Sequence, residues 1–274
     1  MTQFDCIQKA KEMGFEAIDI TEIRPIDGRT AKEQAIIMAE EVKRVGIPVS
    51  SYTVGADLLT GCDGDFDAEV ARLKEQVNIA EILGAPTFRH DATFGYAEGT
   101  RSYRGFINAL PTLAEGCRQI TKYAKTKGIR TMTENHGQFA QDSDRVELLI
   151  NTVANDNYGW LVDVGNFLCV DEDPVTAVGR AAAYAFHAHV KDFHVKSGML
   201  PDPGEPFRKT RGGNFFRGAI IGHGDVPVVQ CLRALKLAGY DGYVSVEYEG
   251  FEDVLFGIQT GLDNLRRYIA MAEG

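Results

Sequence analysis

The chain has 274 residues, of which 44% are hydrophobic and 25% charged, a composition typical of a globular protein. Its 29 basic and 39 acidic residues give a net charge of −10, which would repel a nucleic-acid backbone. No apolar run approaches the roughly 20 residues of a membrane span, and the N-terminus has no signal-peptide pattern. We therefore expect neither a nucleic-acid partner nor a membrane partner.

The cysteines indicate the compartment. They are odd in number, lie far apart and form no Cys-x-x-Cys pair: Cys6, Cys62, Cys117, Cys169 and Cys231. This pattern does not fit a disulfide framework or a thiolate zinc site. We expect a cytoplasmic protein with reduced thiols.

Helices and short strands alternate along the chain. A helix-like segment opens it and ends at Gly14, and further apolar helical repeats cover residues 30–45, 65–83, 111–128, 226–239 and 255–269. The Gly stops and the short strand that follows most helices are typical of βα units. Seven strands are expected: AIDIT (17–21), PVSSYTV (48–54), TFRHDA (87–92), RTMTENH (130–136), GWLVDVG (159–165), FHAHVKD (186–192) and YVSVEYE (243–249).

This alternation predicts an α/β fold with parallel strands, a (β/α)8 TIM barrel. Such a barrel has eight strands in about 250 residues, so one strand is missing from the predicted set. The missing strand would be the first, because the chain opens directly with a helix. Either the barrel is open at that seam or the sequence starts at an internal Met. No linker or low-complexity stretch interrupts the chain, and we expect a single domain over residues 1–274.

Charged side chains occur where a barrel strand should be apolar. Both faces of such a strand are packed, yet four successive strands each place a carboxylate or an imidazole on the same face near the C-terminal end. These residues are Glu134, Asp163, His189 and Glu247. The C-terminal ends of barrel strands are where enzymes of this fold build their active sites.

Three carboxylates and a histidine at one place are costly to bury without a compensating cation. Mixed oxygen and nitrogen ligands suit one divalent ion, with Mn²⁺ expected first and Mg²⁺, Co²⁺ or Zn²⁺ as alternatives. We therefore predict that Glu134, Asp163, His189 and Glu247 are metal ligands. The alternative is an interior ion-pair network that includes Lys191, Arg130 or Arg89.

The sequence resembles the xylose-isomerase-like barrel superfamily, the sugar phosphate isomerase/epimerase group that includes tagatose-type epimerases and inosose dehydratases. The motifs that carry the resemblance are TENHG (133–137), LVDVGNF (161–167), HAHVKD (187–192), GHGDV (222–226) and VSVEYEG (244–250). The family's metal ligands fall on the same Glu134, Asp163, His189 and Glu247. The resemblance also implies that Glu134 and Glu247 transfer protons to and from the substrate.

A cation at this site would chelate neighbouring sugar oxygens and stabilise an enediolate. We therefore expect a divalent-metal-dependent isomerase or epimerase that acts on a keto sugar or sugar derivative. The alternative is a metal-dependent lyase or dehydratase acting on a keto sugar, keto-glycoside or cyclitol, with or without a partner subunit. A third hypothesis is a non-enzymatic, partner-dependent subunit, and a homo-oligomer is expected in either enzymatic case.

Five further residues are candidates for contact with the substrate. Lys191 is in phase with His189 and would hold or polarise a substrate oxygen as a catalytic group. The predicted substrate-binding residues are His136, Arg217, Asn166 and His90.

The segment 196–222 is long for a βα connection, which favours a functional lid. Its basic side chains outnumber its acidic ones, although the whole chain is acidic. This local charge favours an anionic or heavily oxygenated sugar. The alternatives are a solvated loop and an oligomer contact.

Overall fold

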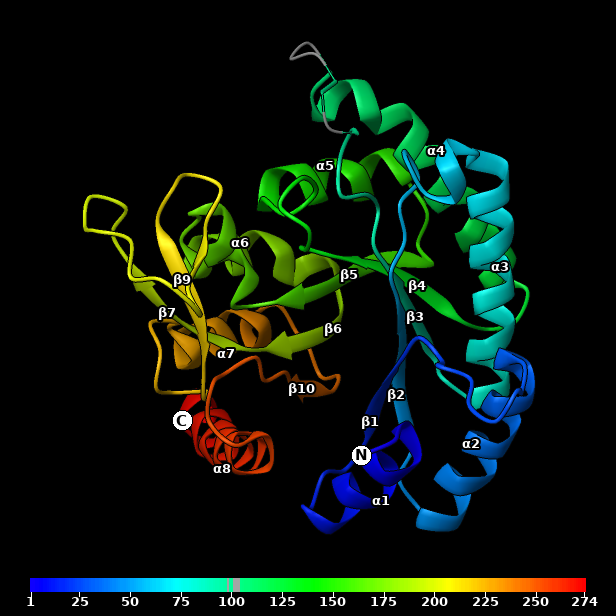
Figure 1. Cartoon of the computed structure of the whole chain (residues 1–274), viewed down its shortest axis with the longest axis horizontal. Helices are drawn as coiled ribbons and strands as arrows, with labels where there is room; N and C mark the ends of the chain where they lie inside the picture. The colour runs from blue at the N-terminus through cyan, green and yellow to red at the C-terminus, as the bar shows by residue number, and fades with distance from the viewer. Residues whose placement is uncertain (98, 101–103) are drawn as a thin grey trace. The chain divides into compact units, whose positions relative to one another are not determined.

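The computed structural model describes residues 1–97, 99–100 and 104–274. The chain forms two compact units. The first unit contains Met1–Thr133 and Leu149–Gly159, and the second contains Glu134–Leu148 and Trp160–Gly274. Figure 1 labels the helices and strands of both.

The predicted fold class is confirmed. Seven parallel strands alternate with helices in the described part of the chain, which is the pattern of a TIM barrel with one strand fewer. The first helix, α1 (Gln3–Glu12), precedes the first strand, β1 (Ile18–Thr21), as expected. Within the described ranges, no helix is long and apolar enough to cross a membrane.

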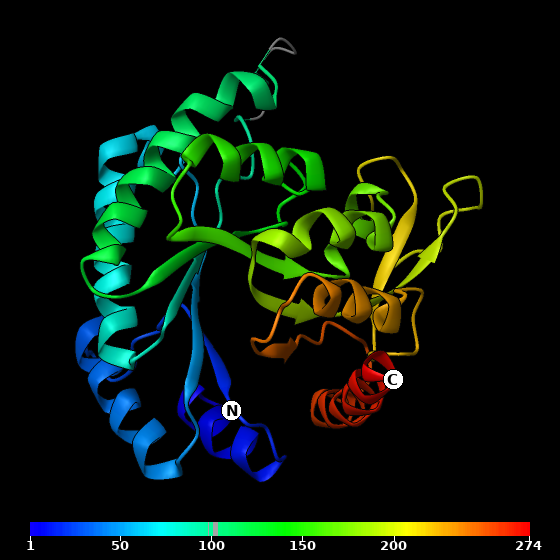
Figure 2. The same ribbon diagram turned by 180° about the vertical axis from the view of Figure 1, so that it is seen from behind.

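The strands of the first unit are paired in the order β1-β2-β3-β4. Helices α2 and α3 pack side by side, and α3 lies against β2 and β3 (Figures 1 and 2). The remaining bounds are β2 (Val49–Val54), β3 (Thr87–His90), β4 (Arg130–Glu134), α2 (Ala31–Val45), η1 (Cys62–Gly64), α3 (Phe66–Leu83) and α4 (Phe106–Lys125).

The start of α4 differs from the prediction. We expected a helix from Pro111, but α4 begins at Phe106 and contains Pro111. Phe106 and Ala109 are buried and extend the apolar face of the helix upstream of the proline. Pro111 is the sixth residue of α4, so it donates no N–H to the backbone oxygen of Ile107, and the buried apolar face holds the helix across this point.

The second unit places three strands in the order β5-β6-β10: β5 (Tyr158–Asp163), β6 (Ala185–Val190) and β10 (Val244–Val246). Helices α6 and α7 pack together, as do α7 and α8. The other bounds are α5 (Ser143–Val153), η2 (Asn166–Val170), α6 (Pro174–Ala181), η3 (Ala182–Tyr184), α7 (Val228–Leu237) and α8 (Val254–Glu273). The division between the units falls within β4, α5 and β5.

The segment expected to be a lid contains strands. β7 (Asp192–Lys196), β8 (Arg208–Lys209) and β9 (Phe215–Ala219) form an antiparallel sheet in the order β7-β9-β8. Phe193 and Phe216 pack edge to face, with ring centroids 5.2 Å apart, and Cys169 completes this small core. A buried apolar cluster of this kind gives the segment a fixed structure.

The Asp192 carboxylate organises the turn that follows β9. Its Oδ2 accepts hydrogen bonds from the backbone N–H groups of Gly222 and Gly224, at 2.8 and 2.9 Å. Its Oδ1 accepts from Phe193 and Val226, at 2.8 and 3.0 Å. Asp192 is buried, so four backbone donors depend on this one side chain.

His90, at the end of β3, is completely buried in the first unit. Its ring packs between those of Phe88 and Tyr158, and its Nδ1 lies 2.8 Å from the backbone oxygen of Asp91. The Nε2 atom has no hydrogen-bond partner among the described residues. Burial lowers the pKa of His90 from 6.5 to about 4, so the ring is neutral in the folded protein at neutral pH.

We expect the stability of the protein to fall on acidification because of His90. The unfolded chain binds a proton below about pH 6.5, whereas the folded protein binds it only near pH 4. His90 therefore costs the protein no stability above about pH 6.5. At about pH 5, the proton that the unfolded chain binds lowers the free energy of unfolding by about 2 kcal/mol. Urea unfolding at pH 7 and pH 5 measures the loss. His90→Gln should reduce it, the exposed control His223→Gln should not, and an equal loss in all three proteins would contradict the assignment.

Candidate metal centre

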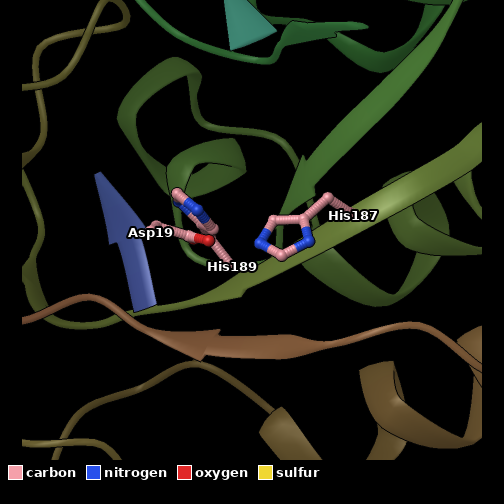
Figure 3. A group of neighbouring side chains, drawn as sticks. All are labelled: Asp19, His187 and His189. Atoms are coloured by element: carbon pink, nitrogen blue, oxygen red, sulfur yellow. The ribbon is translucent and has the colours of Figure 1, made fainter. Parts of the chain in front are cut away.

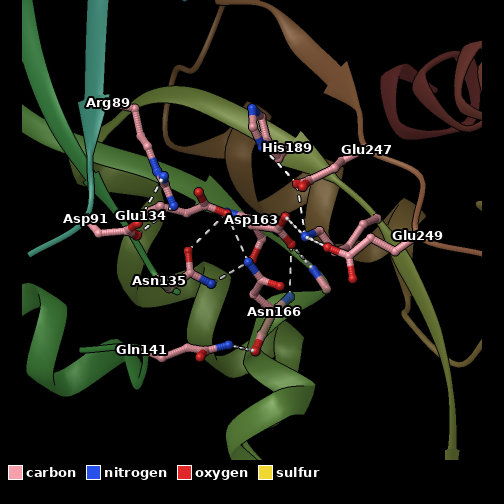
Figure 4. Close-up of polar contacts among 12 residues, drawn as sticks. Arg89, Asp91, Glu134, Asn135, Gln141, Asp163, Asn166, His189, Glu247 and Glu249 are labelled. Carbon is pink, nitrogen blue, oxygen red and sulfur yellow. Dashed lines mark hydrogen bonds and ion pairs between the residues drawn. The ribbon is translucent and has the colours of Figure 1, made fainter. Parts of the chain in front are cut away.

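Four side chains of the second unit converge. Glu134, Asp163, His189 and Glu247 each offer one ligand atom, and these four atoms all lie within 4.8 Å of one another (Figure 4). Glu134, Asp163 and His189 are buried, whereas the Glu247 side chain is 37% exposed. These are the four residues that the alternation of side chains along the predicted strands indicates as metal ligands.

Strand register explains why the residues meet. Asp163, the last residue of β5, is paired with His189 of β6, and His189 is in turn paired with Ser245 of β10. Glu247 follows Ser245 by two residues, and its backbone N–H donates to the oxygen of Val190 at 3.0 Å. Side chains two residues apart along an extended chain point to the same face. The register therefore directs these side chains to one place.

One oxygen of Asp163 is suited to bind a cation. Its Oδ1 accepts hydrogen bonds from the backbone N–H groups of Gly165 and Asn166, at 2.8 and 2.9 Å. Its Oδ2 is buried and has no hydrogen-bond partner among the described residues, and the ammonium group of Lys191 lies 3.6 Å away. Burying such an oxygen without a partner is costly, and coordination of a metal ion would remove the cost. The residues present therefore fit a divalent cation.

Two asparagines hold the ligands in place. Asn166 donates from Nδ2 to Glu134 Oε1 at 2.9 Å. Asn135 Oδ1 accepts hydrogen bonds from the Asp163 backbone N–H at 3.0 Å and from Trp160 Nε1 at 3.1 Å. Its Nδ2 donates to the backbone oxygen of Asp163 at 2.8 Å. Groups that orient metal ligands in this way strengthen metal binding.

Lys191 brings a positive charge into the centre. Its Nζ lies 3.0 Å from Glu247 Oε2 and 3.1 Å from Glu249 Oε1, and its side chain is 3% exposed. Burial disfavours the charged ammonium, but the charges of Asp163, Glu247 and Glu249 outweigh it and raise the pKa of Lys191. The lysine is therefore a permanent cation beside the ligands.

The surroundings shift the pKa values of Asp163 and Glu247 in opposite directions. Burial raises the pKa of Asp163, and the nearby charges of Glu247 and Glu134 add to this effect against the opposing charge of Lys191. Burial would also raise the pKa of Glu247, but the hydrogen bond from His189 and the charge of Lys191 outweigh it and lower that pKa. The surroundings therefore favour the charged form of Glu247 and disfavour that of Asp163.

The two histidines of β6, which Figure 3 draws as sticks, have different hydrogen-bond partners. His189 Nδ1 lies 3.1 Å from Glu247 Oε2. His187 Nε2 lies 3.0 Å from Ser245 Oγ, and the two imidazole rings pack edge to face with centroids 5.4 Å apart. His187 thus supports the ring of His189 as a packed core residue.

The other predicted site residues are distributed as follows. Asn166 lies in the centre and contacts Glu134. His136 is half-buried, two residues after β4, where it bridges to Ala140. Arg217 lies on β9 with its guanidinium 5.7 Å from the Phe207 ring centroid, outside the four-ligand group. His90 belongs to the first unit. Their substrate-binding roles stay predictions.

Three residues near the centre are not among those predicted from the sequence. Asn135 lies on the opposite face of its strand from Glu134, and its contacts depend on how the chain turns after β4. Glu249 alternates in phase with Glu247, and this signal could have identified it. Arg208 has no such signal, but its Nη2 lies 2.7 Å from Glu249 Oε2.

Known proteins are similar to this chain in sequence and in fold. An inosose dehydratase of Clostridium perfringens is 26% identical over 141 residues, which covers 50% of this chain and 46% of that protein. The chain therefore spans about half the length of that curated relative.

Solved structures match over nearly the whole chain. A xylose isomerase-like TIM barrel protein of Mycobacterium smegmatis in complex with magnesium is 17% identical with a TM-score of 0.75, and the match covers 99% of this chain and 89% of that one. D-psicose 3-epimerase with D-tagatose from Clostridium cellulolyticum is 18% identical with a TM-score of 0.74, covering 97% and 93%. At these identities the likeness shows the fold.

The sequence pattern that defines a protein family matches residues 7–268 of this chain, almost its full length. That family is described as the xylose isomerase-like TIM barrel. Its pattern extends across both units and includes all four residues of the candidate metal centre. The chain therefore belongs to the xylose isomerase-like TIM barrel family.

Proposed function

We propose that the protein is a divalent-metal-dependent isomerase or epimerase that acts on a keto sugar or sugar derivative through an enediolate. The observation that carries the proposal is the four-ligand group, in which the buried Asp163 Oδ2 has no hydrogen-bond partner among the described residues. Membership of a family whose structural relatives include a sugar epimerase supports an enzyme that modifies sugars.

The charges of the centre support a divalent ion. Glu134, Asp163 and Glu247 carry three negative charges when ionised, and Lys191 supplies one positive charge. A divalent cation would make the group neutral, and a neutral group is much cheaper to bury than a charged one. Oxygen-rich ligation with one imidazole suits Mn²⁺ and, as alternatives, Mg²⁺, Co²⁺ or Zn²⁺.

The cation, when bound, would supply Lewis-acid stabilisation of the negative charge that the enediolate places on the sugar oxygens. Glu134 and Glu247 would transfer the proton between carbon atoms of the substrate as general base and acid. The two glutamates are held differently, Glu134 by Asn166 and Glu247 by His189 and Lys191. Lys191 would orient a substrate oxygen with its ammonium group.

Elimination on the same site is the second candidate. The similarity to an inosose dehydratase favours it, because removal of water next to a carbonyl starts with the same proton abstraction. In that reaction the carbon is not reprotonated, and the hydroxyl group next to it would leave as water with the proton that the glutamate took from the carbon. The two reactions therefore differ in the fate of the deprotonated substrate.

Incubation in D₂O separates the two reactions. We expect the Mn²⁺-loaded protein to exchange the hydrogen next to the carbonyl of a keto sugar for deuterium and to form an epimer or isomer, which NMR detects. Elimination would instead give a product lacking one water, which mass spectrometry detects. Absence of both products with a metal-loaded protein, across a panel of ketohexoses, keto-glycosides and inososes, would contradict the proposed function.

A further inference from the structure

One cation of the centre is already present in the chain. The Lys191 ammonium group contacts Glu247 at 3.0 Å and lies 3.6 Å from Asp163 Oδ2. These two carboxylates are also candidate metal ligands. Lysine and a divalent cation therefore compete for the same oxygens.

The stem of Lys191 is held in place, so only its tip can change partners. The side chain is 3% exposed and packs against Gly165, where an added Cβ would lie 2.8 Å from Lys191 Cγ and 2.5 Å from its backbone oxygen. Only glycine fits this close approach. The structure gives the ammonium group three carboxylates: Glu247, Asp163 and Glu249.

Glu249 differs from the other two because it is not part of the four-ligand group. Its Oε1 lies 3.1 Å from Lys191 Nζ, and its Oε2 lies 2.7 Å from Arg208 Nη2 on β8. Arg208 thus fixes a carboxylate that can keep hold of Lys191 without using a metal ligand.

We propose that Lys191 is the internal counter-ion of the metal centre, neutralising Glu247 and Asp163 in the metal-free protein and transferring to Glu249 when a divalent cation binds. This inference rests on the proposed metal site. It assigns Glu249 and Arg208 as positioning residues that tune metal affinity through Lys191. The exchange replaces one cation by another at the same oxygens, so the buried carboxylates are never left together without a positive charge.

Calorimetric titration of the metal-stripped full-length protein with Mn²⁺ tests the proposal, at about pH 8 to limit competition by protons. Lys191→Met should bind Mn²⁺ at least about tenfold more tightly, because a unit charge a few ångströms from the bound cation is removed. Glu249→Gln should bind it several-fold more weakly, because the ammonium group then stays on the ligands. Lys209→Met, at an exposed lysine in the same sheet, is the control and should match the wild type.

The double variant Lys191→Met/Glu249→Gln distinguishes a role of Glu249 through Lys191 from a purely structural role. In the Lys191→Met background, Glu249→Gln should have no effect on the Mn²⁺ affinity, because Glu249 acts through the lysine. Equal effects of Glu249→Gln in both backgrounds, or unchanged or weaker binding by Lys191→Met, would overturn the proposal while leaving the metal site intact. Failure of the wild type to bind Mn²⁺ would overturn both. Should Lys191→Met not fold, unchanged affinity in Glu249→Gln alone would overturn the counter-ion role.

Discussion

Asp163→Asn is expected to lower the affinity for Mn²⁺ by more than about 100-fold, since even changes to residues that only orient a metal ligand cost 10- to 100-fold. The amide keeps the size of the carboxylate and an oxygen for the N–H groups of Gly165 and Asn166, so the fold is retained. It removes the negative charge that a cation requires. Elemental analysis after dialysis against Mn²⁺ and calorimetric titration measure the loss.

Thermal unfolding distinguishes a metal ligand from a structural ion pair. Because burial raises the pKa of Asp163, the neutral amide should cost the metal-free protein little stability. Added Mn²⁺ should raise the melting temperature of the wild type and of Asp202→Asn, a control in an exposed loop, but not that of Asp163→Asn. A metal-free Asp163→Asn protein that is strongly destabilised, with Mn²⁺ affinity intact, would favour the interior ion-pair network instead.

Asp192→Ala is expected to destabilise the protein by about 2 kcal/mol or more. It removes the acceptor of four backbone N–H groups, two of which belong to the buried residues Phe193 and Val226, and each buried donor left without a partner costs about 1–3 kcal/mol. The turn is tightly built, because a Cβ at Gly224 would lie 2.3 Å from Asp192 Oδ1. Urea unfolding at neutral pH measures the change.

The matched control for this change is Asp202→Ala. Asp202 accepts a backbone hydrogen bond from Gly204, but its side chain is 59% exposed and water can replace it. Asp192→Asn should lie between the wild type and Asp192→Ala, since the amide offers one acceptor oxygen to four donors. A loss below about 1 kcal/mol for Asp192→Ala would show that the turn is held by other contacts.

The alternation of side chains along the strands was enough to identify the four-ligand group. The positions of its residues depend on that local periodicity and on the edge that parallel strands share. Asp163, His189 and Glu247 lie on one face of consecutive strands, and that placement follows from the alternation of side chains. The parallel α/β fold class followed from the alternation of elements in the same way.

What sequence could not provide was the result of longer-range packing. The length of residues 196–222 indicated a lid but not its strands, because Phe193 and Phe216 bring β7 and β9 together across an intervening loop. The contacts of Asn135 with Asp163 and Trp160 likewise depend on how the chain turns after β4. Periodicity describes which face a side chain occupies, but not which distant side chain it meets.

Three of the four candidate ligands are rigid and one is accessible. Asp163 and His189 lie within six-residue strands and Glu134 ends β4, whereas Glu247 follows the three-residue strand β10 and its side chain is 37% exposed. Glu247 is therefore the ligand that solvent reaches, and it would be the one most easily exchanged for water. The buried side chains of Glu134, Asp163 and His189 would set the size and geometry that a bound cation has to fit.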